Sequence, residues 1–362
     1  MTQTQVVTMP YILGLMEADG SIILTFGTGN STRTLKPWVR ISQKSNQNLL
    51  PMIEDFFVNN GIDCHYERWN PATSKGRAPN LTITKVDSVR KFIELVKKEP
   101  FQFLSQKQRD FYILDCVLNT PSVLTIEDKV NLKLNMHKAN MDQPDVHQAG
   151  KKTRDELEEK YSISSGASNV DALGILKQID QAYANHTDKI QQSIANGEFT
   201  LPVDWLAGLI DGDGSFYVTM RAREPSKRYN KRYLEIEANF TISMEKNALI
   251  TLQALKFVVG SKAPIKESKN HYQFWIRNIS EVKKLLQLQK AYLPVGDYRL
   301  AQYNLVQKIH TYKEKGMMKD GNVVLNIVRE TYALSAHSKG RERTKSLAEM
   351  EAIVKNIYGL II

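Results

Sequence analysis

Cysteine is scarce in this sequence of 362 residues, which contains only Cys64 and Cys116. Two cysteines so far apart cannot form a disulfide framework or a multi-cysteine zinc site. The sequence also lacks an apolar run of the roughly 20 residues that a bilayer-spanning helix needs. No basic residue precedes Arg33, whereas signal and transit peptides are basic near their start. We therefore expect a protein of a reducing compartment, without a membrane partner or a targeting segment in this chain.

Positive charge is the feature that the sequence has in excess. It contains 49 Lys and Arg residues against 39 Asp and Glu residues, which gives a formal net charge of +10. An excess of this kind favours a polyanionic partner, and no basic amphipathic helix points to a membrane surface. The length favours two domains, and an apolar content of 42% is enough for each to build a core. We expect a globular protein that binds nucleic acid.

One decapeptide occurs twice in the chain. Residues 12–21 read ILGLMEADGS and residues 206–215 read LAGLIDGDGS, with Pro10 and Pro202 shortly before them. Proline is favoured in the first turn of a helix, so each copy is predicted to be a helix that begins near its proline. Asp19 and Asp213 occupy the same place in the two copies, 194 residues apart.

The same order of predicted elements follows both copies. Two alternating strands come first, SIILTF or SFYVTM and then a strand that ends at Ile41 or Ile242. A helix at 46–61 or 245–260, two short strands, a helix from about 87 or 280 and a further helix that contains residues 108–112 or 298–303 complete each unit. Each unit reads αββαββα, which predicts an α+β fold of two pseudo-symmetric repeats with antiparallel sheets and helices on one face.

These patterns divide the chain into four parts. The first repeat is expected over residues 1–119 and the second over 201–315. A linker at 120–200 is polar and rich in turn residues, with a helix predicted from about Asp171 to Ile194. A C-terminal extension at 316–362 carries the basic stretch SKGRERTK and the predicted helix SLAEMEAIVKNIYG.

Small residues recur one turn apart in both repeated helices, as Gly14 and Ala18, and as Gly208 and Gly212. Such a spacing forms a groove in which another helix backbone comes close. We therefore expect the two helices to pack on each other at a pseudo-twofold axis. Gly20 and Gly214 follow them and are predicted to end each helix as left-handed caps.

This packing would bring Asp19 and Asp213 together at two helix C-termini. Both carboxylates would then face the negative end of a helix dipole and repel each other. A divalent cation between them would cancel both penalties, and an all-oxygen ligand set favours Mg²⁺. The alternative is a pair of acidic helix ends with glycine caps, which fits one copy well but explains two copies poorly. Because Glu17 and Asp211 differ in length, Asp19 and Asp213 are the expected ligands.

The second copy of the decapeptide resembles the signature of the LAGLIDADG homing endonucleases. Residues 206–214 differ from it at one small residue, and residues 12–20 are a looser copy. The resemblance covers about residues 10–118 and 202–315. It implies an intron-encoded, single-chain nuclease that acts as a pseudo-symmetric monomer on a long double-stranded DNA site. Two or three Mg²⁺ ions at the repeat interface would assist hydrolysis of both strands and leave a staggered break.

The resemblance also implies roles for individual residues. The last acid of each motif binds the metal in this family, which corresponds to Asp19 and Asp213, with Ala18 and Gly212 directly before them in the ligand set. Gln43 matches a position that orients the attacking water. The expected catalytic residues are Asp19, Asp213, Gln43, Lys107 and Arg299.

The sequence departs from the family pattern at two of these places. The counterpart of Gln43 in the second repeat is Met244, with Glu245 beside it. A basic residue expected before the last helix of each unit is replaced by Ser105 and Gly296, and Lys107 and Arg299 are the nearest substitutes. We therefore expect one half of the site to be catalytically weaker, so that the two strands are cut at unequal rates.

The hairpins carry the expected DNA-binding surface, because a two-stranded ribbon fits the major groove. Residues 221–233 contain six basic residues and one acidic residue, and residues 31–44 contain four basic residues and no acidic one. If the apolar alternates of each strand face the helices, the opposite face and the loops contact DNA. The predicted DNA-binding residues are Ser21, Ile23, Thr25, Arg33, Lys36, Trp38, Arg40, Ser215, Tyr217, Thr219, Arg221, Arg223, Lys227, Arg228, Lys231, Arg232 and Tyr233.

The two hairpins differ in length, since Asp19 and Ile41 are 22 residues apart whereas Asp213 and Ile242 are 29 apart. Unequal arms predict a target with unequal halves. Two other functions remain open at this point. One is a group I intron RNA maturase, with its own intron RNA as partner, and the other is a DNA-binding regulator without catalysis. The resemblance favours an organelle, a mitochondrion or a chloroplast, as the location.

Overall fold

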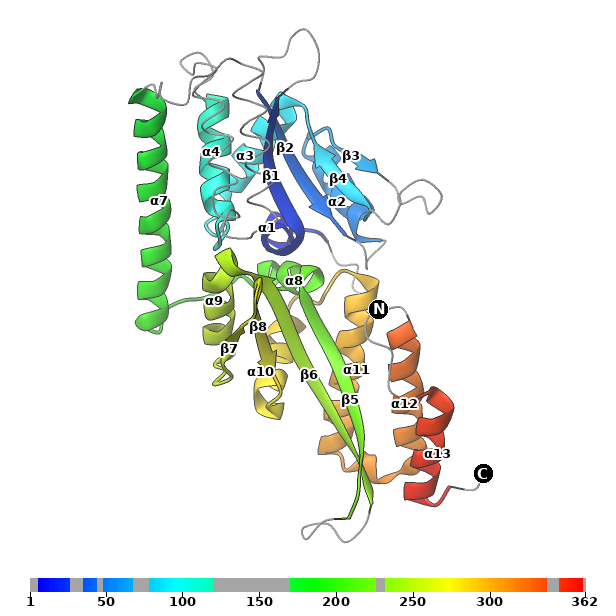
Figure 1. The fold of residues 1–362 in the computed structure, drawn as a ribbon. Helices are drawn as coiled ribbons and strands as arrows, with labels where there is room; N and C mark the ends of the chain where they lie inside the picture. The colour runs from blue at the N-terminus through cyan, green and yellow to red at the C-terminus, as the bar shows by residue number, and fades with distance from the viewer. Residues whose placement is uncertain are drawn as a thin grey trace.

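The computed structural model describes residues 6–26, 35–43, 48–67, 78–119, 170–225, 232–336 and 345–360. Two similar units lie above and below a central pair of helices (Figure 1). Each unit has one antiparallel sheet with helices on one face, which confirms the expected α+β fold of two repeats. Among the described residues, no helix is long and apolar enough to cross a membrane.

The first repeat follows the predicted order of elements, including the helix expected around residues 108–112. It runs through α1 (Met9–Asp19), β1 (Gly20–Phe26), β2 (Leu35–Ser42), α2 (Leu49–Asn59), β3 (His65–Glu67), β4 (Asn80–Ile83), α3 (Val86–Lys98) and α4 (Lys107–Asn119). The pattern αββαββα is therefore followed by α4. Pro10 lies in the first turn of α1, as predicted.

The second repeat has the same order with longer strands. It runs through α8 (Val203–Gly212), β5 (Gly214–Arg223), β6 (Tyr233–Glu245), η2 (Lys246–Ala248), α9 (Leu249–Val259), β7 (Ile265–Glu267), β8 (His271–Ile276), α10 (Ile279–Lys290) and α11 (Asp297–Glu314). Pro202 is the N-cap of α8 rather than a residue of its first turn. Gly260 has a φ of 65° and ends α9 as a left-handed cap.

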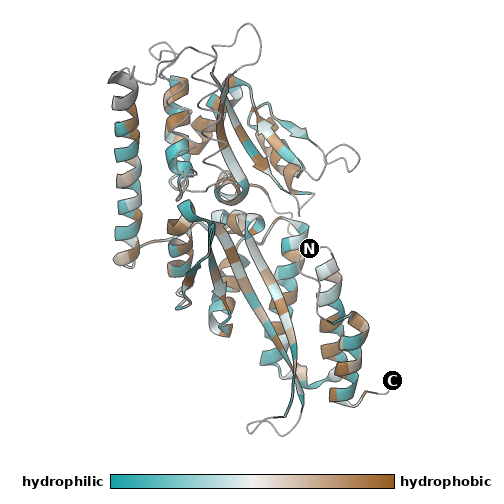
Figure 2. Cartoon of the chain, viewed as in Figure 1, coloured by the Kyte–Doolittle hydropathy of each residue, from teal (hydrophilic) through white to brown (hydrophobic). Residues whose placement is uncertain are grey.

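The two sheets have equivalent strand orders, β1-β2-β4-β3 and β5-β6-β8-β7. Gly20 pairs with Ile41 in the first sheet, and Gly214 pairs with Ile242 in the second, so the register is the same in both. Hydrophilic and hydrophobic residues alternate along β5 and β6 (Figure 2). The apolar face of each sheet packs on the helices, which leaves a polar face on the opposite side.

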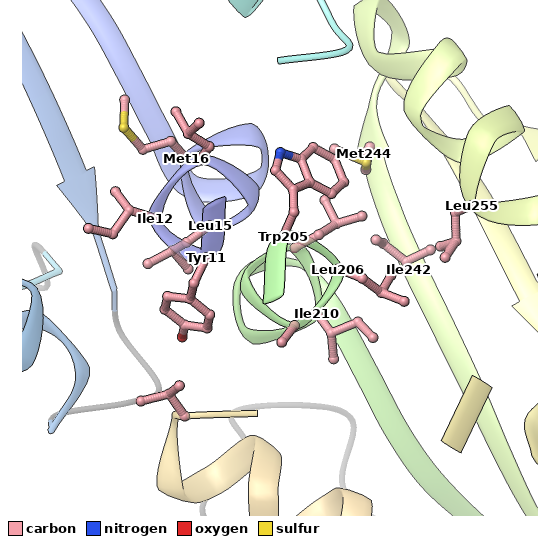
Figure 3. Close-up of a cluster of buried hydrophobic side chains, with 14 of the residues drawn as sticks. Tyr11, Ile12, Leu15, Met16, Trp205, Leu206, Ile210, Ile242, Met244 and Leu255 are labelled. Carbon is pink, nitrogen blue, oxygen red and sulfur yellow. The ribbon is translucent and has the colours of Figure 1, made fainter. Parts of the chain in front are cut away.

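Helices α1 and α8 pack backbone to backbone at the centre of the molecule (Figure 3). A Cβ at Gly14 would lie 1.8 Å from the carbonyl oxygen of Trp205, and a Cβ at Gly208 would lie 2.0 Å from that of Tyr11. Tyr11 and Trp205 are equivalent residues, 194 positions apart. The contacts are thus reciprocal, which confirms the expected packing of the two motif helices about a pseudo-twofold axis.

The prediction for Gly20 and Gly214 was wrong in its physical reason. Gly20 has a φ of −86° and a ψ of 156°, which is extended backbone, and neither glycine has a positive φ. The strand leaves the helix so abruptly that a Cβ at Gly20 would lie 2.6 Å from the Cα of Met16. Gly214 approaches the Cα of Ile210 in the same way, at 2.8 Å. Close approach, rather than a left-handed turn, requires glycine here.

Two elements outside the repeats flank the last helix of each unit. The long helix α7 (Val170–Ala195), predicted in the linker, packs on α4 and on α9, so it contacts both repeats (Figure 1). The rest of the linker, residues 120–169, lies outside the described residues. After η3 (Met317–Lys319), α12 (Gly321–Ala336) packs beside α11, and α13 (Leu347–Tyr358) packs on α12 and β6. Ser346 begins α13 with a capping box, where the sequence predicts a helix.

The central packing predicts a large effect of one methyl group. Gly208→Ala should lower the free energy of unfolding by about 2 kcal/mol or more, because the new Cβ meets backbone atoms that cannot move aside. Gly174→Ala in α7 is the control, since its Cβ meets no atom within 4 Å and alanine favours a helix. Urea unfolding of both variants provides the measurement. Equal unfolding midpoints for the two variants would contradict the packing described.

Candidate active site

Asp19 and Asp213 end the two central helices and line the same cavity of about 650 Å³. Burial raises the pKa of Asp19 to about 6. The pKa of Asp213 is raised to about 7, first by burial and then by the charge of Asp19. The structure therefore brings the two predicted ligands together, and it holds two carboxylates where each makes the ionisation of the other costly.

The charged groups of Lys107, from α4, and Arg299, from α11, lie at the C-terminal ends of α1 and α8. The Nζ of Lys107 donates to the carbonyl oxygens of Met16 and Glu17 at 2.6 Å and of Ala18 at 3.1 Å. The Nη2 of Arg299 donates to the carbonyl oxygen of Gly212 at 3.3 Å. Each cation thus caps a motif helix beside its aspartate, and both lower the pKa of the two carboxyls against the effect of burial.

Gln43 and Met244 make the two halves of the site unequal. The Nε2 of Gln43 donates to the Oδ2 of Asp19 at 2.6 Å and to the carbonyl oxygen of Asp211 at 3.3 Å. Met244 has no group that can donate, and it lies among the apolar residues around α8 and α9 (Figure 3). Its neighbour Glu245 lines the cavity and raises the pKa of Asp213. Within the part of the chain that the structure describes, a side-chain amide therefore orients Asp19 and none orients Asp213.

The inner acids of the motifs, Glu17 and Asp211, bind backbone amides of the loops that lie before α4 and α11. Glu17 accepts the amide N–H groups of Leu104 at 3.3 Å and Ser105 at 2.9 Å, and the hydroxyl of Thr251 at 2.6 Å. Both acids are fully buried, at 1% and 0% exposure. Glu17 thus binds the loop before α4, the helix that carries Lys107. Asp211 does the same in the second repeat, where it binds the loop before the helix that carries Arg299.

Asp211 accepts the amide N–H groups of Val295 at 2.7 Å and Gly296 at 3.2 Å through one carboxylate oxygen. The hydroxyl of Tyr11, from the other repeat, donates to the same oxygen at 2.6 Å. Burial raises the pKa of Asp211 to about 6, although these donors lower it. The sequence shows these acids only as possible ligands, and their real partners come from loops nearly 90 residues away.

The donor set fits a divalent cation that shares its ligands with a substrate. Asp19 and Asp213 supply two carboxylates, and no group of three or more His, Cys, Asp or Glu residues within the described ranges could hold a metal alone. Mg²⁺ commonly takes one or two carboxylates and completes its shell with water and phosphate oxygens. The carbonyl oxygens of Ala18 and Gly212 accept from Lys107 and Arg299. Their role as further ligands stays a prediction.

The predicted DNA-binding residues of the described strands share the polar faces of the two sheets. Ser21 pairs with Arg40, Ile23 with Trp38 and Thr25 with Lys36 across β1 and β2. In the second sheet this face carries Ser215, Tyr217, Thr219, Arg221, Arg223 and Tyr233. Arg232 is paired with Glu224. Arg33, Lys227, Arg228 and Lys231 lie outside the described residues.

Several residues of this face escaped the sequence analysis. Strand β6 adds Glu235 and Glu237 to this face, and strand β8 adds Gln273 and Trp275. This follows from the register, since Thr219 pairs with Glu237 and Thr241 pairs with Trp275. Arg223 forms an ion pair with Glu235, at 2.6 Å. Asp110, in the first turn of α4, also lines the cavity, and burial raises its pKa to about 7. Strand alternation identifies the four strand residues as members of this face once the sheet register is known.

Comparison with solved structures shows the same fold over nearly the whole chain. The structure of I-SmaMI bound to an uncleaved DNA target in the presence of calcium ions is 14% identical, with a TM-score of 0.62, over 92% of this chain and all of that one. I-LtrWI bound to target DNA is 17% identical, with a TM-score of 0.56, over 92% and 98% of the two chains. I-AabMI bound to uncleaved DNA is 13% identical, with a TM-score of 0.58, over 92% and 100%.

The family comparison concerns the second repeat. Residues 206–310 match the model of the LAGLIDADG endonuclease family, while no curated protein matches the chain. The matched segment contains α8 with Asp213, the second sheet and Arg299. The first repeat has the same fold and places Asp19 against Asp213. Residues 206–310 thus match the LAGLIDADG endonuclease family, and the chain as a whole shares the two-repeat fold of the solved structures.

Proposed function

We propose that this protein is a site-specific DNA endonuclease that makes a Mg²⁺-dependent, staggered double-strand break as a pseudo-symmetric monomer. The observation that carries the proposal is the pair Asp19 and Asp213, held in one cavity at the ends of two helices with raised pKa values. Two buried acids that repel each other destabilise a protein unless a cation binds between them. Because one chain supplies both halves of the site, a second copy is not required.

The substrate proposed is a long, asymmetric stretch of double-stranded DNA. Each sheet presents a polar face opposite its helices, and the strands of the second hairpin span 10 and 13 residues against 7 and 8 in the first. Hairpins of this length fit the major groove, where base edges differ for every base pair. Unequal hairpins support a target with unequal halves. The similar solved structures that carry DNA support a duplex as the substrate.

The roles of the side chains follow from their positions. A bound Mg²⁺ would supply a Lewis acid and lower the pKa of its bound water. Asp19 and Asp213 bind and orient this ion at the repeat interface. Lys107 and Arg299 stand beside the two carboxylates as fixed positive charges, where they can stabilise negative charge on a phosphate. Gln43 orients Asp19 and can hold a water molecule near it.

Removing either metal-binding charge should stop cleavage without preventing DNA binding. Asp19→Asn and Asp213→Asn keep the size of the side chain, so we expect cleavage of the target to fall at least about 100-fold while DNA affinity changes little. Asp55→Asn on the exposed face of α2 is the matched control and should cut at the wild-type rate. A gel assay with Mg²⁺ and a filter-binding assay measure the two properties. Normal cleavage by both variants would contradict the metal-binding role of the two aspartates, and DNA binding without any cleavage by the wild type would leave only the DNA-binding function.

The raised pKa of Asp213 predicts a pH dependence of stability in the metal-free protein. A folded pKa of about 7, well above the 3.8 of an unperturbed aspartate, means that the folded state holds the proton more tightly. This contribution is complete below about pH 4 and is lost as the pH rises through 7. In EDTA at pH 8, Asp213→Asn should therefore unfold with a free energy roughly 2–4 kcal/mol above wild type, and at pH 4 the difference should vanish. A difference independent of pH would contradict the buried carboxylate pair.

Unequal orientation of the two aspartates predicts unequal strand cleavage. In a time course with supercoiled plasmid, a nicked intermediate should accumulate, because only Asp19 is held by an amide. Gln43→Met makes the halves alike at this position and should slow the faster strand about tenfold, bringing the two rates together. Strand-specific labels at the two DNA ends give both rates. If the slower strand slowed instead, Gln43 would act on the other half of the site.

A further inference from the structure

We propose that the linker helix α7 is part of the active site of the first repeat, with His186 as the residue through which α7 positions Lys107. This inference rests on the proposed nuclease function. It concerns the segment between the repeats, which the motifs of the sequence leave without a role. The loop 102–105 lies one residue before α4, the helix that carries Lys107.

The loop 102–105 is held by bonds to its backbone from several directions. The indole Nε1 of Trp205 donates to the carbonyl oxygen of Gln102 at 2.9 Å. The side chain of Gln108 accepts the amide N–H of Phe103 at 3.1 Å. Glu17 accepts the next two amide groups. Trp205 comes from the second repeat and Glu17 from the first motif helix, so the loop is tied to both central helices.

A further partner of this loop comes from the linker. The Nε2 of His186 lies 2.8 Å from the carbonyl oxygen of Phe103. A carbonyl oxygen can only accept, so Nε2 carries the hydrogen and the neutral imidazole donates it. Two residues after the loop ends, the Nζ of Lys107 bonds to three carbonyl oxygens at the end of α1. A shift of the loop would therefore move the ammonium group beside Asp19.

Helix α7 is fixed well enough to act as a support. Leu176, Ile179 and Ile190 are buried along one side of it, and it packs on α4 of the first repeat and α9 of the second (Figure 1). Arg109 of α4, which is almost fully buried, forms an ion pair with Asp180 at 2.6 Å. His186 therefore sits between an anchor near the N-terminal half of α7 and the contact with α9, which would hold its ring against the loop.

In the second repeat, the corresponding loop is held in place without a histidine. Its loop before α11 is bound by Asp211 through Val295 and Gly296. The carbonyl oxygen of Val295 accepts from the Nδ2 of Asn48 at 3.4 Å, and the Oδ1 of Asn48 accepts the amide N–H of Asp297 at the same distance. His186 and Asn48 thus have matching places, each outside the repeat that it supports. One acts near Lys107 and the other near Arg299.

This match provides a test that separates positioning from general stability. His186→Ala should change the ratio of the two strand-cleavage rates by about three- to tenfold, because it affects the Lys107 half alone. Asn48→Ala should change the ratio in the opposite direction. His186→Gln keeps an N–H donor at the same reach and should restore the wild-type ratio. Lys177→Ala, on the exposed side of α7, is the control and should leave it unchanged.

Amide hydrogen exchange of the same proteins gives a readout that does not need cleavage. His186→Ala should speed exchange at residues 103–107 and leave 295–299 unchanged, and Asn48→Ala should do the reverse. If His186→Ala slows both strands equally, or leaves exchange at 103–107 unchanged, α7 is a tether and the proposal is wrong. If no variant and no wild-type protein cleaves DNA, the nuclease function fails, and the exchange pattern alone decides whether His186 positions the loop.

Discussion

The close packing of α1 and α8 is the constraint on which the rest of the structure depends. Gly14 and Gly208 let each helix touch a carbonyl of the other, at distances that no side chain would allow. Helices joined at this distance have little freedom to slide, since any shift brings backbone atoms into collision. The two C-terminal ends are therefore fixed relative to each other, and the positions of Asp19 and Asp213 follow from this.

The same packing creates an electrostatic cost that the surrounding residues reduce but do not remove. Lys107 and Arg299 lower the pKa of both aspartates, yet burial leaves the pKa of Asp19 near 6, and burial together with the charge of Asp19 leaves the pKa of Asp213 near 7. Without a cation, the two ionised aspartates therefore still destabilise the folded protein. Glu17 and Asp211 instead accept hydrogen bonds from backbone amides, which hold the loops before the helices that carry Lys107 and Arg299.

Much of this arrangement could be predicted from the sequence, and the parts that could not have physical reasons. The doubled decapeptide predicts the helix pair, since glycine spacing is a local property of one segment. The reason for Gly20 could not be predicted, because its restriction comes from the close approach of Met16 and not from its own φ. His186 and Asn48 carry no local signal at all. Their partners are loop carbonyls 83 and 247 residues away in the chain, which only the folded structure brings near.

The central claim is that one divalent cation site is shared by the two repeats. A crystal structure of the protein with its DNA target and Ca²⁺ tests this directly, because Ca²⁺ occupies such sites at about 2.3–2.6 Å from oxygen ligands. The account predicts a cation within this distance of one carboxylate oxygen of Asp19 and one of Asp213, with a DNA phosphate oxygen completing the contact. Cations bound only elsewhere, with the two carboxylates in contact with neither metal nor phosphate, would contradict it.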